Sequence, residues 1–229
     1  MVKEIPVITI DGLSGSGKGT ISKMLSDDLG WNILDSGALY RTLTFLMENN
    51  GISIRDLKEK KEQILKDFEV TFEIGLIGEP VNIYLKGKDI TSLVRTEEIA
   101  EKTSTLSSIK EIRDFIRPCQ RAFKKVPGLI ADGRDMGTVI FPEADLKIYL
   151  TATLEERTKR RETQLKRQGT KVNMRFLLKE LEARDKKDIE RELSPLKPAD
   201  DSYEIDTTGL SPDEVLKKIK YLLLELGFK

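Results

Sequence analysis

A glycine-rich stretch near the start of the chain contains residue types that bind phosphate groups. It fits the pattern G-x-x-x-x-G-K-[ST] loosely, because Gly19 occupies the Ser/Thr position and Thr20 follows it. Glycines let backbone N–H groups turn inward around an anion, and a following helix adds its positive N-terminal end. Lys18 can reach the terminal phosphates of a nucleotide, and the Thr20 hydroxyl can bind Mg²⁺. The predicted phosphate and metal ligands are Gly12, Leu13, Ser14, Gly15, Ser16, Gly17, Lys18, Gly19 and Thr20.

The sequence on either side of this stretch supports the same function. The apolar run 6–11 predicts a strand, and an apolar stripe from Ile21 to Leu29 predicts a helix that Gly30 ends. The order of strand, glycine loop and helix is the context that a phosphate loop requires. A glycine-rich turn with an accidental lysine is therefore the weaker alternative.

Two polar groups follow other predicted strands. Residues 35–37 (Asp-Ser-Gly) come after the short strand 31–34, and residues 132–135 (Asp-Gly-Arg-Asp) come after the buried strand 129–131. Ligands of open parallel sheets bind outside the carboxyl ends of the strands. We therefore expect both groups to lie beside the phosphate loop.

The residue types in these two groups suit a phosphorylated ligand. Asp132 can hold Mg²⁺ through water, Arg134 can fork onto a phosphate, and Asp135 can accept from an amino group. The alternative is an Asp-Gly turn closed by an internal ion pair. Ser36 and Arg41 suit a polar ligand that carries an anion, but they could equally be an N-cap serine and a surface arginine.

A long helix supplies another set of candidates. Asn173 is predicted to begin it, and it extends to about Glu192. Residues three or four positions apart share one face, and this face starts apolar and becomes charged: Leu177, Leu181, Arg184, Asp188 and Arg191. Such a helix could pack on the core at one end and enter a cleft at the other. An exposed Arg184–Asp188 pair, worth about 0.3–0.5 kcal/mol, explains the spacing equally well.

Basic side chains outnumber acidic ones between residues 155 and 171. One interpretation is a solvated helix, and another is a mobile lid whose arginines neutralise a transferring phosphoryl group. A nucleic-acid patch is disfavoured, because no aromatic side chains interleave with the charges and the net charge of the chain is zero.

Composition excludes several classes of function. The 229 residues include 39 basic and 39 acidic side chains, so we expect no general attraction to nucleic acid or to an anionic membrane. The sequence has no histidine, which excludes Ser/His and Cys/His mechanisms but leaves phosphoryl transfer open. The single cysteine cannot form an internal disulfide, and no secretory or membrane-spanning run is found. These features predict a cytoplasmic protein.

The remaining patterns predict an α/β fold. Ser36 is expected to cap a helix over 38–47, and Ser53 a helix that reaches Phe68. Alternating apolar residues then predict a small antiparallel β insertion over 69–94, with strands at 70–74, 81–85 and near 89–91. We therefore expect one domain, 1–229, with a five-stranded parallel sheet flanked by helices. The insertion 69–94 and a lid over 155–171 belong to this domain.

Four motifs make the chain resemble the bacterial cytidylate kinase family, and the resemblance covers essentially the whole length. They are ITIDGLSGSGKGT, LDSGALYR, GLIADGRDMGTVIFP and RDKKDIER. The resemblance implies a P-loop kinase that uses ATP and Mg²⁺ and phosphorylates CMP and dCMP. It also implies that the insertion 69–94 enlarges the monophosphate site. We also expect a monomer.

The same resemblance implies roles for individual residues. Ser36, Arg113 and Asp135 would contact cytosine, Ser104, Arg184 and Asp188 would lie around the sugar, and Arg41, Arg134 and Arg191 would hold the acceptor phosphate. With Tyr40, these residues form the predicted substrate site. Arg157 and Arg161 would contact the donor phosphates. The predicted catalytic residues are Lys18, Asp132, Arg134 and Arg191.

Two other functions remain open from the sequence. The chain could phosphorylate UMP or another small acceptor, which a kinase assay across acceptors would reveal. It could also be a nucleotide-dependent switch without phosphotransfer, but the N-K-x-D signal of GTPase switches is absent. Binding of ATP without turnover on any monophosphate would support that alternative.

Overall fold

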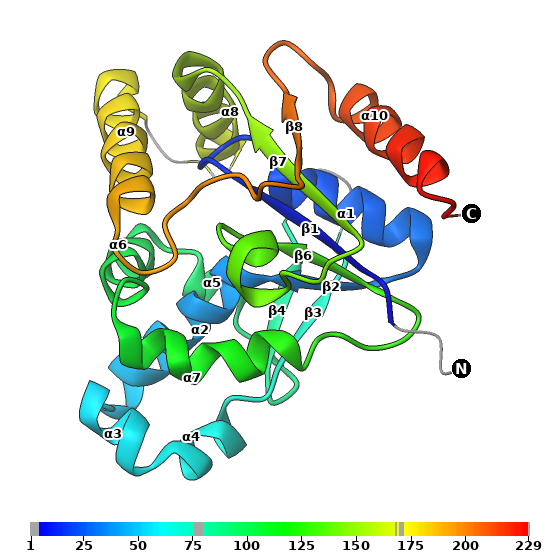
Figure 1. Cartoon of the computed structure of the whole chain (residues 1–229). Helices are drawn as coiled ribbons and strands as arrows, with labels where there is room; N and C mark the ends of the chain where they lie inside the picture. Colours follow the sequence, from blue (N-terminus) through cyan, green and yellow to red (C-terminus); the bar gives the residue numbers. More distant parts are fainter. Residues whose placement is uncertain (1–4, 76–79, 168, 170–171, 229) are drawn as a thin grey trace.

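A parallel sheet forms the centre of the molecule (Figure 1). The computed structural model describes residues 5–75, 80–167, 169 and 172–228. All neighbours in the five-stranded sheet are parallel, in the order β2-β6-β1-β7-β8. The five strands are β1 (Val7–Gly12), β2 (Asn32–Asp35), β6 (Leu129–Asp132), β7 (Leu146–Thr151) and β8 (Tyr203–Asp206). The expected five-stranded parallel sheet is confirmed.

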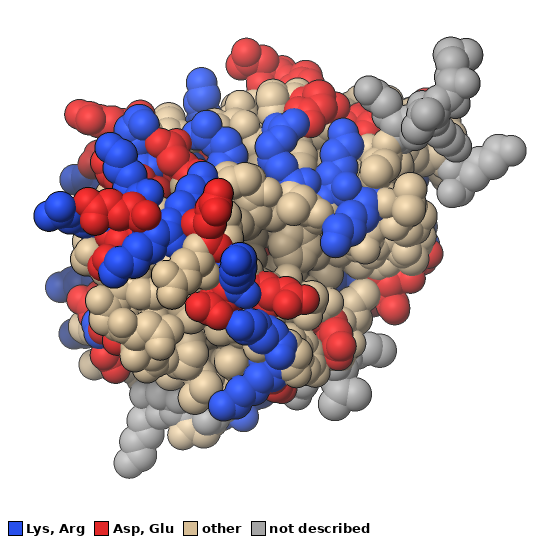
Figure 2. Space-filling model, turned by 90° about the horizontal axis from the view of Figure 1, so that it is seen from below, with Lys and Arg blue, Asp and Glu red and all other residues tan. Residues whose placement is uncertain are grey.

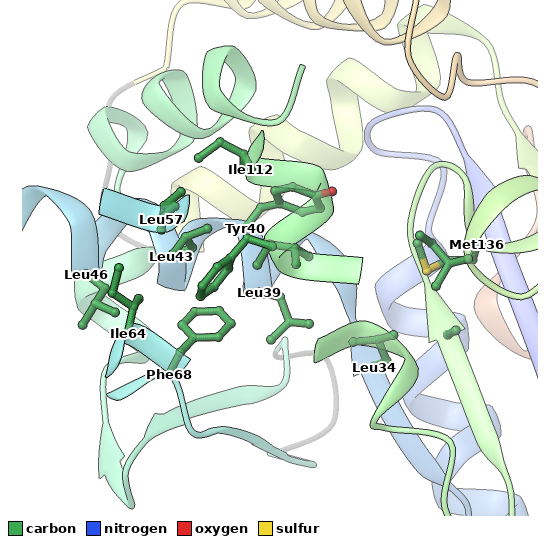
Figure 3. Close-up of a cluster of buried hydrophobic side chains, with 14 of the residues drawn as sticks. Leu34, Leu39, Tyr40, Leu43, Leu46, Leu57, Ile64, Phe68, Ile112 and Met136 are labelled. Atoms are coloured by element: carbon green, nitrogen blue, oxygen red, sulfur yellow. The ribbon is translucent and has the colours of Figure 1, made fainter. Parts of the chain in front are cut away.

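Apolar side chains on both faces of the sheet explain why helices cover both sides. Successive residues of a strand point to opposite faces, and Val7 and Ile8 accordingly belong to different clusters. Ile8 packs with α1 (Lys18–Leu29) and α10 (Pro212–Glu225). Val7 belongs to the larger cluster, part of which Figure 3 shows around Leu39, Leu43 and Phe68.

The other helices follow the sequence pattern closely, with small shifts at their ends. Asn173 caps the long helix as expected, through its side chain, and α9 ends at Glu190 rather than at Glu192. The predicted lid helix is α8, and residues 168 and 170–171 of that prediction lie outside the described part. The helices are α2 (Ser36–Asn50), α3 (Ile54–Glu59), α4 (Lys61–Asp67), α5 (Thr91–Val94), α6 (Glu97–Leu106), α7 (Lys110–Arg121), α8 (Leu154–Arg167) and α9 (Met174–Glu190), and a short π-helix spans Met136–Ile140.

Two local predictions are wrong. Asp35, not Ser36, caps α2: its carboxylate accepts from the Ala38 N–H at 2.9 Å, and Ser36 is the first helical residue. The helix expected from Ser53 to Phe68 is divided at Lys60 into α3 and α4. Lys60 leaves the helical region because its φ is −117°.

A second, antiparallel sheet lies apart from the first. It contains β3 (Val70–Glu73), β4 (Asn82–Leu85) and β5 (Lys88–Asp89) in that order, which confirms the expected hairpin and third strand. Positions 76–79 of the expected turn lie outside the described residues. Ile83 of β4 packs with Ala38, so the small sheet is attached to the rest of the domain through α2.

Charges of both signs are interspersed over the face that Figure 2 shows, as the balanced composition predicts. Within the described ranges, no helix is long and apolar enough to cross a membrane.

Candidate active site

The phosphate loop begins at the carboxyl end of β1, the middle strand of the large sheet. Gly12 has a φ of 145°, and a Cβ there would lie 2.0 Å from the Leu150 carbonyl oxygen, so only glycine fits. Gly17, with a φ of 95°, precedes the first turn of α1. The Lys18 Nζ donates to the Leu13 carbonyl at 2.7 Å, so the loop wraps around this side chain. The N-terminal end of α1 therefore faces any anion held in the loop.

Lys18 and Asp132 are two buried charges that depend on each other. Burial, helped by Arg134, lowers the pKa of Lys18 to about 7, while Asp132 opposes the shift. Burial also raises the pKa of Asp132 to about 7, against the pull of Lys18. Asp132 lies beside Asp35 in the register of β6 and β2. Because each shift favours the neutral form, a bound anion would restore the charge of Lys18 and a bound cation that of Asp132.

Ser14 connects the phosphate loop with the predicted acceptor site. The Arg134 Nη2 donates to the Ser14 hydroxyl at 3.0 Å, and its Nε donates to an Asp188 carboxylate oxygen at 3.0 Å. Burial alone would raise the pKa of Asp188, but nearby arginines, Arg134 first among them, outweigh it and lower this pKa. Arg134 therefore contacts both the loop and the charged end of α9.

A buried ion pair holds the main chain of the same serine. Arg157 pairs with Asp185, and both side chains are buried. The Asp185 carboxylate accepts from the Ser14 N–H at 3.1 Å, and Arg157 donates to the Ser14 carbonyl at 3.0 Å. Arg157 also donates to the Ala152 carbonyl at 3.0 Å. In this arrangement Arg157 binds the loop itself, and its predicted contact with donor phosphates stays a prediction.

Two other arginines of α8, Arg160 and Arg161, also have protein partners. Arg161 pairs with Glu97 of α6, so the structure does not bring it to the loop. Arg160, which the sequence analysis did not assign, donates to the Thr207 carbonyl at 2.6 Å and to the Ser16 carbonyl at 3.4 Å. A donor-phosphate role for Arg161 remains untested.

Two of the three predicted base-reading residues meet in the structure. Arg113 of α7 pairs with Asp135, and both side chains are buried. The Arg113 guanidinium lies 5.9 Å from the ring centre of Tyr40. The Tyr40 hydroxyl has no hydrogen-bond partner among the described residues, and burial raises its pKa to about 12.

Ser36, the third predicted base-reading residue, contacts a side chain that the sequence analysis missed. The Gln120 Nε2 donates to the Ser36 hydroxyl at 2.8 Å, and both residues are buried. Gln120 lies seven positions after Arg113, on the same face of α7. That spacing was the signal that could have revealed it.

Asp11 holds the backbone that follows Asp135. Its carboxylate accepts from the Met136 N–H at 2.9 Å and from the Gly137 N–H at 2.8 Å, directly after Asp135. Burial raises the pKa of Asp11 to about 6, although the two N–H groups oppose the shift. No signal in the sequence distinguished Asp11 from an ordinary strand end.

Three more arginines belong to the predicted substrate site. Arg41 donates to the Val94 carbonyl at 3.2 Å, and burial, reinforced by Arg184, lowers its pKa to about 10. Arg184 has no hydrogen bond or ion pair to the described residues, and burial lowers its pKa. The Arg191 Nη2 is buried and has no partner within the described ranges. Clustered cations with unused donors suit an anionic ligand.

Ser104 is the predicted sugar residue that lies on α6. It is half-buried, and its hydroxyl makes no hydrogen bond within the described residues. Its neighbour Thr105 accepts from Lys187 of α9 at 3.3 Å, so α6 and α9 approach each other here.

No group of three or more Asp, Glu, His or Cys residues that could hold a metal is found in the described ranges. Thr20 is exposed in the first turn of α1, and a Cβ on Gly19 would lie 3.4 Å from an Asp132 oxygen. A magnesium ion bound here would therefore take most of its ligands from phosphate oxygens and water, as Mg²⁺ commonly does.

Comparisons with known proteins identify the family of this chain. The family model for cytidylate kinase matches residues 8–224. A cytidylate kinase from Stutzerimonas stutzeri (strain A1501) is 47% identical over 96% of this chain and 95% of its own length. A cytidylate kinase from Pseudomonas syringae pv. tomato is 48% identical over 93% of both chains. Among solved structures, a shikimate kinase from Acinetobacter baumannii is 19% identical with a TM-score of 0.42 over 98% of this chain and 96% of its own. The family match and the close relatives show that this chain belongs to the cytidylate kinase family.

Proposed function

We propose that this chain transfers the γ-phosphoryl group of ATP to CMP or dCMP, giving ADP and CDP or dCDP. The family and the names of its close relatives support this activity. The observation that carries it is the position of Arg134, which donates to Ser14 of the phosphate loop and to Asp188 beside the acceptor arginines. A single guanidinium thus lies between the donor loop and the proposed acceptor site, where it can neutralise charge during phosphoryl transfer.

Charge neutralisation is the main task of these residues in the proposed reaction. Lys18 and the N–H groups of the loop hold the donor phosphates, and Arg41, Arg134 and Arg191 hold the acceptor phosphate. Thr20, with Asp132 acting through water, would hold Mg²⁺, which would supply further positive charge to the donor phosphates. The acceptor phosphate is already anionic, so the reaction needs little help from a general base.

The buried pair of Arg113 and Asp135 supports cytosine as the base of the acceptor nucleotide. Asp135 accepts from the N4 amino group, Arg113 donates to ring acceptors, and Ser36 completes the base site. Uracil reverses one of these demands, because it carries a carbonyl oxygen in place of the amino group. Ser104, Arg184 and Asp188 are proposed to border the sugar.

Two parts of the chain are proposed to close around the ligands. The insertion 69–94 borders the acceptor, and the lid 155–171 brings Arg161 to the donor phosphates. Closure would exclude water and so limit the hydrolysis of ATP. We further propose one domain over 1–229, a monomer, and a location in the cytoplasm. The single cysteine and the bacterial relatives support that location.

A coupled assay of ADP release tests the proposal. Purified protein with ATP and Mg²⁺ is offered CMP, dCMP, UMP and AMP in parallel. Turnover with CMP and dCMP above the other two is expected. Preference for UMP or AMP would discard the base assignment of Ser36, Arg113 and Asp135. No turnover with any acceptor would contradict the activity as a whole.

A further inference from the structure

The ion pair between Arg157 and Asp185 is notable for what surrounds it. Asp185 comes from the middle of α9 and Arg157 from the first turns of α8, yet both reach the phosphate loop. They meet at a single peptide position, because Asp185 accepts from the Ser14 N–H and Arg157 donates to the Ser14 carbonyl. Both main-chain polar groups of one loop residue are therefore fixed by two side chains from other elements.

We propose that Asp185 and Arg157 act as positioning residues that set the conformation of the phosphate loop. The proposal rests on the proposed function, in which this loop binds ATP. Arg157 also donates to the Ala152 carbonyl, which anchors the pair to the end of β7. Gly15 lies close against it, since a Cβ there would lie 3.1 Å from the Arg157 Cβ. The pair thus fits the loop too tightly to be an incidental surface contact.

The position of Ser14 gives the pair influence over both ligands. Its hydroxyl accepts from Arg134, and Arg134 in turn donates to Asp188. A displacement of the Ser14 peptide would move the donor loop relative to the acceptor arginine. Catalysis by positioning is sensitive to such shifts, and a misplacement of about 1 Å can cost roughly 100-fold in rate.

A simple structural role makes a different prediction, and a double variant separates the two. Asp185→Leu leaves the Arg157 charge buried and unpaired, so Tm should fall by roughly 6 to 20 °C. Combining it with Arg157→Met removes both charges, and replacing a buried pair with apolar residues is often neutral for stability. The double variant should therefore regain most of the lost Tm.

The positioning role predicts that activity does not return with stability. For Asp185→Leu and for the double variant, kcat/KM for ATP should fall roughly 10- to 100-fold. The Ser14 main chain loses the partner of its N–H in the single variant and the partners of both its polar groups in the double variant. The rise in Tm that saturating ATP and Mg²⁺ cause should shrink in both variants, which reports donor binding without turnover. Recovery of wild-type kcat/KM together with Tm in the double variant would overturn the proposal.

Asp185→Asn tests the proposal from the opposite side. Asparagine can still accept from the Ser14 N–H but cannot pair with the arginine charge. The fall in kcat/KM for ATP should therefore be smaller, about 3- to 10-fold. If Arg157 instead binds ATP directly, Asp185→Asn would free it, and ATP affinity would stay equal or rise while Arg157→Met lost affinity. That pattern also overturns the proposal.

Asp28→Asn is the matched control. Asp28 pairs with Lys220 at 2.6 Å in a half-exposed pair between α1 and α10, so the same substitution there should change neither kcat/KM nor Tm appreciably. Absence of turnover in the wild type would contradict the proposed function. The ATP-dependent rise in Tm would still test the positioning role.

Discussion

Two buried arginine–aspartate pairs in this molecule differ in what else they bind. In both pairs the side chains are 4% to 8% exposed, and in both the partners come from different structural elements. Besides pairing with each other, Arg157 donates to the Ala152 and Ser14 carbonyls, and Asp185 accepts from the Ser14 N–H. The Asp135 carboxylate has no hydrogen bond to the described residues except the one from Arg113.

The difference shows that the hydrogen bonds of a buried charge pair decide whether the pair fixes the backbone or stays available to a ligand. An ionised carboxylate can accept about four hydrogen bonds, so Asp135 retains capacity for a ligand. The Asp185 carboxylate, in contrast, already accepts from the Ser14 N–H as well as from Arg157, so this pair is tied to the backbone of the phosphate loop. Substitutions at the first pair should therefore change acceptor recognition, and those at the second should change loop geometry.

Lys18→Ala should have the largest effect on turnover, with both pairs left intact. Removing one charge that stabilises the transferring group is expected to lower kcat by about 100- to 1000-fold. The rise in Tm on adding CMP should persist, because the acceptor site is unchanged. Steady-state kinetics and thermal unfolding with CMP check this, and a kcat within tenfold of wild type would contradict it.

Asp135→Ala should mainly reduce CMP affinity. A hydrogen bond to a charged group is worth about 1.5–3 kcal/mol, so KM for CMP should rise roughly 10- to 100-fold. KM for ATP should change little. The proposed difference between the pairs is contradicted if Asp135→Ala leaves CMP affinity unaltered. It is also contradicted if Asp185→Asn raises KM for CMP as strongly as Asp135→Ala does.

Gln120→Leu should cause a smaller loss that acts through Ser36. Without its donor, the Ser36 hydroxyl is no longer held, and kcat/KM for CMP should fall about 5- to 10-fold. In a Ser36→Ala background the same change should have almost no further effect. The adjacent Cys119→Ala serves as control. Equal losses in both backgrounds would show that Gln120 acts on helix packing instead.

The smallest expected effect is a pH dependence of stability that comes from Asp11. This residue holds the backbone next to Asp135, a member of the first pair. Its folded pKa of about 6 exceeds the ordinary value of 3.8, so the folded state binds the proton more tightly. The free energy of unfolding should therefore decrease as pH rises, by about 1 kcal/mol between pH 5 and pH 6. Urea unfolding of wild type and Asp11→Asn measures this, and parallel curves would contradict it.

The sequence predicted the elements well where one residue decides the geometry. Gly30 ends α1 and Asn173 begins α9 as expected, since a left-handed cap and a side-chain cap are local features. Ser36 was mistaken for a cap because Asp35, one position earlier, serves equally well, and spacing cannot choose between them. Ser36 instead uses its hydroxyl with Gln120, from a helix far along the chain.

What the sequence alone determined was the chemistry and the order of elements. The glycines, Lys18 and the polar residues after each strand are local patterns, and parallel strands bring their carboxyl ends to one edge. Only the tertiary structure decided which charges meet. It placed Arg157 against Ser14 and Asp185, and Arg161 against Glu97, although the two arginines lie on one basic helix. The physical reason is that a buried charge must find its partner in space, and that partner lies on whichever element packs against it.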